Sequence, residues 1–264
     1  MKYLEGPRPR LFAHRGAAGV APENTLEAFA AGLSAGAERL ELDVHATRDG
    51  EVVVIHDPSV DRTSDGSGPV KEMSLAELKR LDAGYRFVAP GAGTTFRGRD
   101  VRVPTLAELL AAFPDVPLNI EIKQEDPPIE PAVLHVLDRF AARARTLLAA
   151  EEATIMGRIR AAAPDMLTSF SALDVAEFVQ RHRTLDFAGY RPPGIALQIP
   201  PSFGDTELIT AGTVAAAHAL GLEVHAWTIN EEQEIETLIG LGVDGIMSDF
   251  PARAAAVLHR HGLR

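Results

Sequence analysis

The chain has 264 residues, of which 46% are hydrophobic and 24% charged, and its formal net charge is −11. This is the composition of an ordinary soluble globular protein with enough apolar material for a sizeable core. The acidic balance argues against a nucleic-acid-binding protein, because phosphate backbones are bound by an excess of Lys and Arg. Cysteine is absent, which excludes disulfides and thiolate metal sites.

Short apolar runs alternate with amphipathic stretches along the first half of the chain. The patterns predict strands at 10–14, 38–44 and 116–123, a helix at 25–36, and a long helix, with a break allowed, at 129–150. The run 51–57 follows an Asp49-Gly50 turn and predicts an extra hairpin arm. A short helix is expected from Ser74. The Pro- and Gly-rich stretch 84–104 indicates an excursion between strand units.

The second half repeats the alternation. Strands are predicted at 166–171, 195–200, 223–229 and 244–250, with a weaker candidate at 207–210, and helices at 173–182, 212–221, 231–242 and after residue 250. Such alternation implies parallel strands joined by right-handed crossovers. Eight strands in this length fit a (β/α)8 TIM barrel, which usually takes about 250 residues, although a doubly wound open sheet is an alternative. We predict one barrel domain over 1–264 with an excursion at about 45–104.

Acidic residues collect near the ends of two predicted strands. Glu41 and Asp43 are two residues apart, so their side chains leave one face of the strand, and the same holds for Glu121 and Lys123. In a barrel, inward positions near the carboxyl ends of the strands line the active site. Three carboxylates there repel by roughly 4 kcal/mol per pair at 4 Å. Either Lys123 or an arginine pairs with them, or a cation binds; we favour a hard divalent ion, Ca²⁺ or Mg²⁺.

Two histidines end strand-like runs, and they are the candidates for proton transfer. His14 follows the first strand and His56 follows the hairpin arm. Imidazole titrates near neutral pH, so such a pair can remove and donate protons at one phosphorus atom. The other histidines are interpreted as structural, with His225 the least secure because it lies on a predicted barrel strand. In the turn 16–25, Glu23 and Asn24 are candidates for bracing this site.

These motifs resemble the glycerophosphodiester phosphodiesterase family. The match runs through AHRGAAGVAPENT (13–25), ELDVHATRDGEVVVIHDPSVDRTSDGSG (41–68), PTLAELL (104–110), NIEIK (119–123), HAWTIN (225–230) and DGIMSDFP (244–251). It covers both ends of the chain and most of the first half, and the order and spacing of the histidines, the ExD pair and the HDxxxxRT element make it specific. The stretch 124–200 has few marked positions.

The resemblance implies a barrel related to the phosphatidylinositol-specific phospholipases C, and it implies roles. His14 and His56 correspond to the two catalytic histidines. The divalent-metal ligands correspond to Glu41, Asp43 and Glu121. The resemblance also implies phosphate or substrate contacts, made by Arg15, Lys123 and Trp227; simple core packing is an equal alternative for Trp227.

The activity implied is metal-dependent hydrolysis of small glycerophosphodiesters to glycerol 3-phosphate and an alcohol, in lipid and glycerol metabolism. Alternatives are a lysophospholipase D acting at the same site and a non-catalytic metal- and phosphate-binding relative. A lysophospholipid needs an apolar groove, for which Tyr85, Phe87, Val88 and Phe96 are the only candidates in the sequence, and these we expect to pack over the barrel instead. No apolar run is long enough for a signal peptide or a membrane span, so we expect a cytoplasmic protein without stable membrane insertion. The sequence indicates no oligomeric state.

Overall fold

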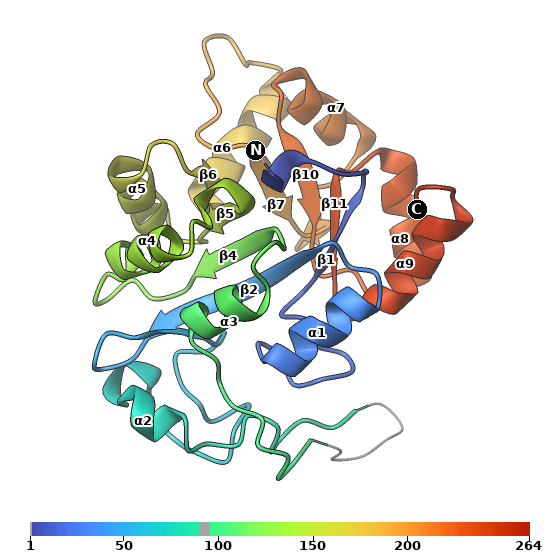
Figure 1. Cartoon of the computed structure of the whole chain (residues 1–264). Coiled ribbons are helices and arrows are strands. Elements are labelled where there is room, and N and C mark those ends of the chain that lie inside the picture. The colour runs from blue at the N-terminus through green and yellow to red at the C-terminus, as the bar shows by residue number, and fades with distance from the viewer. Residues whose placement is uncertain (1, 90–95) are drawn as a thin grey trace.

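The computed structural model, which describes residues 2–89 and 96–264, contains a barrel of parallel strands (Figure 1). Neighbouring strands follow the order β6-β5-β4-β2-β1-β11-β10-β7, and a parallel bridge from Ser169 to Ala196 joins its two ends. The barrel strands are β1 (Arg10–Ala13), β2 (Arg39–Ala46), β4 (Leu118–Ile122), β5 (Thr146–Ala149), β6 (Leu167–Thr168), β7 (Ala196–Ile199), β10 (Glu223–Ala226) and β11 (Gly245–Ser248). The predicted (β/α)8 barrel is confirmed, and the open-sheet alternative is wrong.

Helices cover the outside of this barrel and alternate with its strands (Figure 1). Their apolar faces pack with the outward side chains of the strands in one large core. In the described part of the chain, no helix is long and apolar enough to cross a membrane. The main helices are α1 (Leu26–Ser34), α3 (Leu106–Ala112), α4 (Glu130–Arg139), α5 (Ala153–Ala162), α6 (Ala172–Thr184), α7 (Ala211–Ala219), α8 (Glu232–Leu241) and α9 (Pro251–Arg260).

Two elements differ from the sequence prediction. The stretch 129–150 is not one long helix, because α4 ends at Arg139, Ala141 adopts φ 48°, and β5 enters the barrel at Thr146. Periodicity alone cannot separate a short buried apolar strand from a helical segment. The candidate strand at 207–210 is also wrong: the chain forms a small hairpin of β8 (Ser202–Phe203) and β9 (Thr206–Glu207) outside the barrel, and α7 follows.

The excursion after β2 forms a small lobe with its own core. β3 (Val52–Val54) pairs antiparallel with β2, so the predicted hairpin arm is confirmed, and the lobe also holds the helix α2 (Leu75–Leu78). Phe96 packs against the lobe's core and meets Phe87 edge-on, while Val88 is 63% exposed. None of the predicted groove residues lines the main cavity described below. Residues 90–95, within the predicted excursion, lie outside the described residues.

Charged groups fill the amino-terminal end of the barrel. Glu223 accepts hydrogen bonds from Arg10 Nη1 at 2.6 Å and from Arg8 Nη2 at 2.7 Å. His225 Nε2 lies 2.9 Å from the same carboxylate, and the ring of Tyr3 is fully buried beside Phe12. Such a buried carboxylate is stable only because every neighbour pairs with it.

Because Glu223 is ion-paired, the free energy of unfolding should depend on pH in the acid range. Burial raises the pKa of Glu223, but the hydrogen bond from His225 and the charge of Arg10 outweigh burial and hold it at about 2. Because the folded pKa lies below the unfolded value, the stabilisation is complete above about pH 4.5 and is lost as pH falls toward 2. We expect Glu223→Gln to lower the free energy of unfolding by about 3 kcal/mol at pH 6, with the difference shrinking below pH 4.5. Urea unfolding of both proteins at pH 3 and 6 checks this; an unchanged difference contradicts it.

Candidate active site

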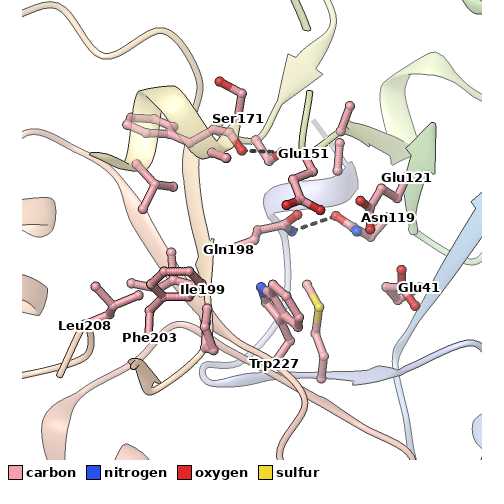
Figure 2. A pocket seen from close by; sticks show the side chains of 18 of the residues that line it. Glu41, Asn119, Glu121, Glu151, Ser171, Gln198, Ile199, Phe203, Leu208 and Trp227 are labelled. Carbon is pink, nitrogen blue, oxygen red and sulfur yellow. Dashed lines mark hydrogen bonds between the residues drawn. The ribbon is translucent and has the colours of Figure 1, made fainter. Parts of the chain in front are cut away.

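A cavity of about 620 Å³ opens at the carboxyl end of the barrel strands, within the size range of small-molecule sites. Carboxylates and amides line one side of it, and the apolar side chains of Ile199, Phe203, Leu208 and Trp227 line another (Figure 2). The cavity brings together most of the residues that the sequence selected: His14, Arg15, Glu41, His56, Glu121, Lys123 and Trp227. Asp43 joins them through the carboxylate cluster.

Glu41, Asp43 and Glu121 form this carboxylate cluster. One oxygen from each lies within 4.8 Å of the other two, because Asp43 on β2 stands opposite Glu121 on β4 in the strand register. Glu41 and Asp43 are almost completely buried. Burial and the charge of Asp43 raise the pKa of Glu41 to about 7. Three oxygen donors in one small space, one of which would otherwise hold a proton, fit a hard divalent cation.

Basic groups also border the cluster. The sequence had offered pairing with Lys123 or an arginine as the alternative to a bound cation. Lys123 Nζ lies 2.8 Å from Glu121 Oε1 and 3.6 Å from Asp43 Oδ1, and Arg15 Nε lies 3.3 Å from Asp43 Oδ2. Burial raises the pKa of Asp43, but Lys123 and Arg15 outweigh it and lower the net value. Two cations do not balance three carboxylates. Among the described residues, Glu41 has only His14 as an ion-pair partner, at 3.9 Å, so room for a further positive charge remains there.

The raised pKa of Glu41, at about 7, predicts how cation binding depends on pH. Below that pH the carboxyl holds a proton which a cation must displace, so affinity should fall as pH falls, by up to about tenfold per unit. We expect Mg²⁺ or Ca²⁺ binding at pH 6 to release close to one proton. Calorimetry in two buffers with different ionisation enthalpies measures the number released. Release of no proton at pH 6 would contradict this assignment.

His14 is held by an aspartate from the far end of the chain. Its Nδ1 lies 2.7 Å from Asp249 Oδ1, while Asn230 Nδ2 donates to Asp249 Oδ2 over 2.8 Å. Burial lowers the pKa of His14, but the carboxylates of Glu41 and Asp249 outweigh burial and raise it overall. With Nδ1 engaged by Asp249, Nε2 is the nitrogen that faces the carboxylate cluster, 3.9 Å from Glu41.

His56 has the same arrangement, but its aspartate is the next residue in the sequence. Its Nδ1 lies 2.7 Å from Asp57 Oδ1, and Arg62 holds Asp57 through its Nε at 2.6 Å. The hydrogen bonds from Arg62 lower the pKa of Asp57 to about 2, so the aspartate stays ionised. Arg62 also binds both oxygens of Glu23, at 2.6 and 2.7 Å. An aspartate that fixes one ring nitrogen leaves the other free for proton transfer.

Asp57, Asp249 and Arg62 contact the two histidines or their partners, and the sequence assigned no role to them. Their signals were present in the HD, RT and SDF motifs, but the pairing of Asp249 with His14 joins residues 235 positions apart. The predicted bracing by the 16–25 turn is visible: Glu23 accepts from Arg15 at 3.1 Å, and Asn24 Nδ2 donates to Asp43 over 2.9 Å. Asn24 adopts φ 57°, which turns its side chain toward the cluster.

Trp227 differs from three of the remaining histidines in its surroundings. Trp227 is 41% exposed and lines the cavity, so it is not a core residue. His225 is fully buried and binds Glu223, His45 bonds to the carbonyl of His56 at 3.0 Å, and His218 pairs with Asp244 at 2.8 Å. The structural interpretation of these three histidines therefore agrees with their contacts.

Arg62 provides a test of how His56 is positioned. We expect Arg62→Ala to lower kcat/KM by about 10- to 100-fold, as for residues that orient a catalytic group, because Asp57 and Glu23 lose their shared partner. Arg62→Lys should recover only part of the activity, since an ammonium lacks the planar fork. Arg48→Ala is the matched control: Arg48 also forms an exposed ion pair, with Glu77 at 3.1 Å. Equal losses in Arg62→Ala and Arg48→Ala would contradict the positioning role.

Comparison with known proteins identifies the family to which the chain belongs. The model of the glycerophosphoryl diester phosphodiesterase family matches residues 14–253. The chain belongs to this family. The glycerophosphodiester phosphodiesterase of Caldanaerobacter subterraneus subsp. tengcongensis is 32% identical to it, over 96% of this chain and 98% of the relative. The chain is therefore an enzyme of the phosphoric diester hydrolase class.

Two further relatives are named for their product or their substrate class. A phosphodiesterase of Oleispira antarctica, solved in complex with the product sn-glycerol-3-phosphate, is 29% identical, with a TM-score of 0.76 over 95% of this chain and 97% of that one. A lysophospholipase D of Rattus norvegicus is 28% identical over 95% of this chain and 86% of the relative.

Proposed function

We propose that this enzyme hydrolyses small glycerophosphodiesters, such as glycerophosphocholine and glycerophosphoethanolamine, to glycerol 3-phosphate and an alcohol. One observation carries the proposal: two imidazoles, each fixed through Nδ1 by an aspartate, border a single cluster of three carboxylates. His14 Nε2 lies 3.9 Å from Glu41, and His56 lines the same cavity as Glu41 and Glu121. Two proton-transfer groups at one cation site are what in-line attack at phosphorus requires.

The proposed cofactor is one Ca²⁺ or Mg²⁺ ion held by Glu41, Asp43 and Glu121. The cluster offers oxygen ligands only, which these hard cations prefer. When bound, such a cation lowers the pKa of a coordinated hydroxyl and stabilises negative charge on the phosphate. Lys123 and Arg15, which border the cluster, then remain as donors for the phosphate oxygens.

The proposed reaction has two steps. His14 removes the proton of a substrate glycerol hydroxyl, whose oxygen attacks phosphorus, and His56 protonates the departing alcohol, which leaves a cyclic glycerol phosphate. Water then opens the cycle with the histidine roles reversed, giving glycerol 3-phosphate. Arg15 and Lys123 stabilise charge on the equatorial oxygens, and Trp227 forms a wall beside the alcohol. The order of the two histidines is assigned by analogy with the family.

Phosphorus NMR of the purified enzyme with glycerophosphocholine and Mg²⁺ or Ca²⁺ tests the function. We expect glycerol 3-phosphate and choline to form in equal amounts, and EDTA to abolish turnover reversibly. Accumulation of a cyclic phosphate identifies a lyase in place of a hydrolase. The proposal fails if no diester is consumed with either cation, and full activity after thorough chelation removes the cation from it.

An apolar groove favours lysophospholipids as a second candidate substrate. Ala172, Val175, Ala176, Val179 and Arg183 all line the cavity, and their three- and four-residue spacing forms one stripe along α6. Phe203, 77% exposed on the hairpin, and Leu208 line it with them. In this second proposal the groove holds a single acyl chain, in a place that the sequence prediction missed. Comparing kcat/KM for glycerophosphocholine and for a short-chain lysophosphatidylcholine, the latter kept below its critical micelle concentration, decides between the two substrates.

The remaining assignments are proposals of the same kind. We propose that 1–264 forms one domain with the excursion at 45–104 inserted in it, that the protein acts in the cytoplasm in lipid and glycerol metabolism, and that its partner is the small-molecule substrate and not nucleic acid. The net charge of −11 supports the last point. Limited proteolysis tests the domain assignment, because an independent excursion would be released as a stable fragment.

A further inference from the structure

Two side-chain amides lie in the cavity beside the carboxylate cluster. Gln198 on β7 donates through Nε2 to Asn119 Oδ1 on β4 over 2.7 Å, and both residues line the cavity (Figure 2). Asn119 precedes Glu121 by two residues, so both side chains leave the same face of β4. Asn119 therefore lies deeper in the barrel than the proposed cation ligand. The reaction steps above use neither amide.

The orientation of the amides is set from the opposite end of the barrel. The carboxylate of Glu223 accepts from two arginines and has no hydrogen to donate, so His225 Nε2, at 2.9 Å, carries the proton of their bond. On the other side of the ring, Gln198 Nε2 lies 3.2 Å from Nδ1 and can only donate, so Nδ1 is the acceptor of that bond.

The acceptor on His225 fixes both amides. Gln198 Nε2 lies 3.2 Å from His225 Nδ1, so it donates one hydrogen there and the other to Asn119 Oδ1. Gln198 cannot turn over without placing its carbonyl oxygen against the acceptor on His225. Gln198 Oε1 and Asn119 Nδ2 are then the amide atoms left for a ligand, one an acceptor and the other a donor.

A neighbouring acceptor and donor match a particular chemical group. An alcohol hydroxyl donates one hydrogen bond and accepts another, whereas a phosphate oxygen only accepts and a quaternary ammonium does neither. We infer that Asn119 and Gln198 form a binding subsite for a free alcohol hydroxyl of the substrate, the terminal hydroxyl of its glycerol moiety. This inference rests on the proposed function, and it adds a specificity determinant to it.

The subsite has a consequence for substrate choice. A site built to bind a hydroxyl discriminates strongly against an analogue that lacks it, because its own buried polar groups are left unpaired. An acyl chain on the terminal hydroxyl removes the hydrogen that Gln198 Oε1 would accept. The amide pair therefore favours deacylated glycerophosphodiesters over lysophospholipids at this position, despite the apolar groove along α6.

The test compares two substrates of the intact enzyme. One is glycerophosphocholine, and the other is its analogue with the terminal hydroxyl replaced by hydrogen, which keeps the vicinal hydroxyl. Release of choline is measured for both. We expect kcat/KM to be at least about tenfold higher for glycerophosphocholine, the effect of leaving one or two polar groups unpaired. A ratio near one with good turnover overturns the inference and leaves the proposed function standing; no turnover of either substrate overturns both.

Three variants test whether the amides cause the ratio of kcat/KM between the two substrates. Gln198→Met keeps the side-chain shape and should bring the ratio close to one. His225→Phe, whose ring can keep the contact with Phe12 at 5.1 Å, lets Gln198 turn over and should lower the ratio to about threefold. Ile120→Val is the control, because this buried neighbour of Asn119 packs in the outer core, and it should keep the full ratio. If Gln198→Met keeps the full ratio, the subsite assignment is wrong, whether or not His225→Phe folds.

Discussion

Replacing His14 or His56 with alanine is expected to lower kcat by about 10²- to 10⁴-fold, the usual contribution of one general acid or base. Both imidazoles line the cavity that holds the carboxylate cluster, and each has an aspartate oxygen 2.7 Å from its Nδ1. Because one proton must leave the attacking hydroxyl and another must reach the departing alcohol, neither histidine can replace the other. The kcat of the double variant should therefore be little lower than the kcat of the less active single variant.

A matched control separates catalysis from folding. His135→Ala removes an exposed imidazole from α4 that does not line the cavity. This change should leave kcat within about twofold of the wild-type value. Circular dichroism and thermal unfolding show whether each variant is folded. Activity of a folded His14→Ala or His56→Ala protein within a few-fold of the wild type would remove that residue from the acid–base pair.

Glu121→Gln is expected to have the second large effect, a loss of about 10² or more in kcat at 1 mM Mg²⁺ or Ca²⁺. The change removes one of three cation ligands and, with it, the several kcal/mol of charge stabilisation that a bound cation supplies. It also frees Lys123, whose Nζ lies 2.8 Å from Glu121, so the cluster gains net positive charge and repels the cation further. Raising the cation concentration should restore part of the rate.

The control is Glu125→Gln, four residues farther along the chain, which removes an exposed carboxylate outside the cluster. Its cation dependence should match that of the wild type. Titration of activity with Mg²⁺ and with Ca²⁺ for all three proteins gives the half-saturating concentrations. If Glu121→Gln leaves both the half-saturating concentration and kcat unchanged, Glu121 is not a cation ligand.

The sequence was informative where local chemistry limits the possibilities. The spacing of Glu41 and Asp43 places both carboxylates on one strand face whatever surrounds them, and the run 51–57 after an Asp-Gly turn forms the expected hairpin with β2. The segment 146–149 was missed for an equally local reason. Its four residues are all buried and three of them are apolar, so the segment shows no alternation, because a parallel barrel strand is covered on both faces. The run therefore continued the apolar pattern of the preceding helix.

The sequence by itself determined the fold class and the residue types of the site, because strand periodicity and carboxylate spacing are properties of short segments. Only the tertiary structure decided which groups meet: Asp249 with His14 across 235 residues, Arg62 with both Asp57 and Glu23, and Asn119 with Gln198 across 79 residues. It also decided that side chains of α6, and none of the four aromatic and apolar candidates in the excursion, line the main cavity. These pairings depend on the closure of the barrel, which brings the carboxyl ends of distant strands to one cavity, and no local pattern encodes that distance.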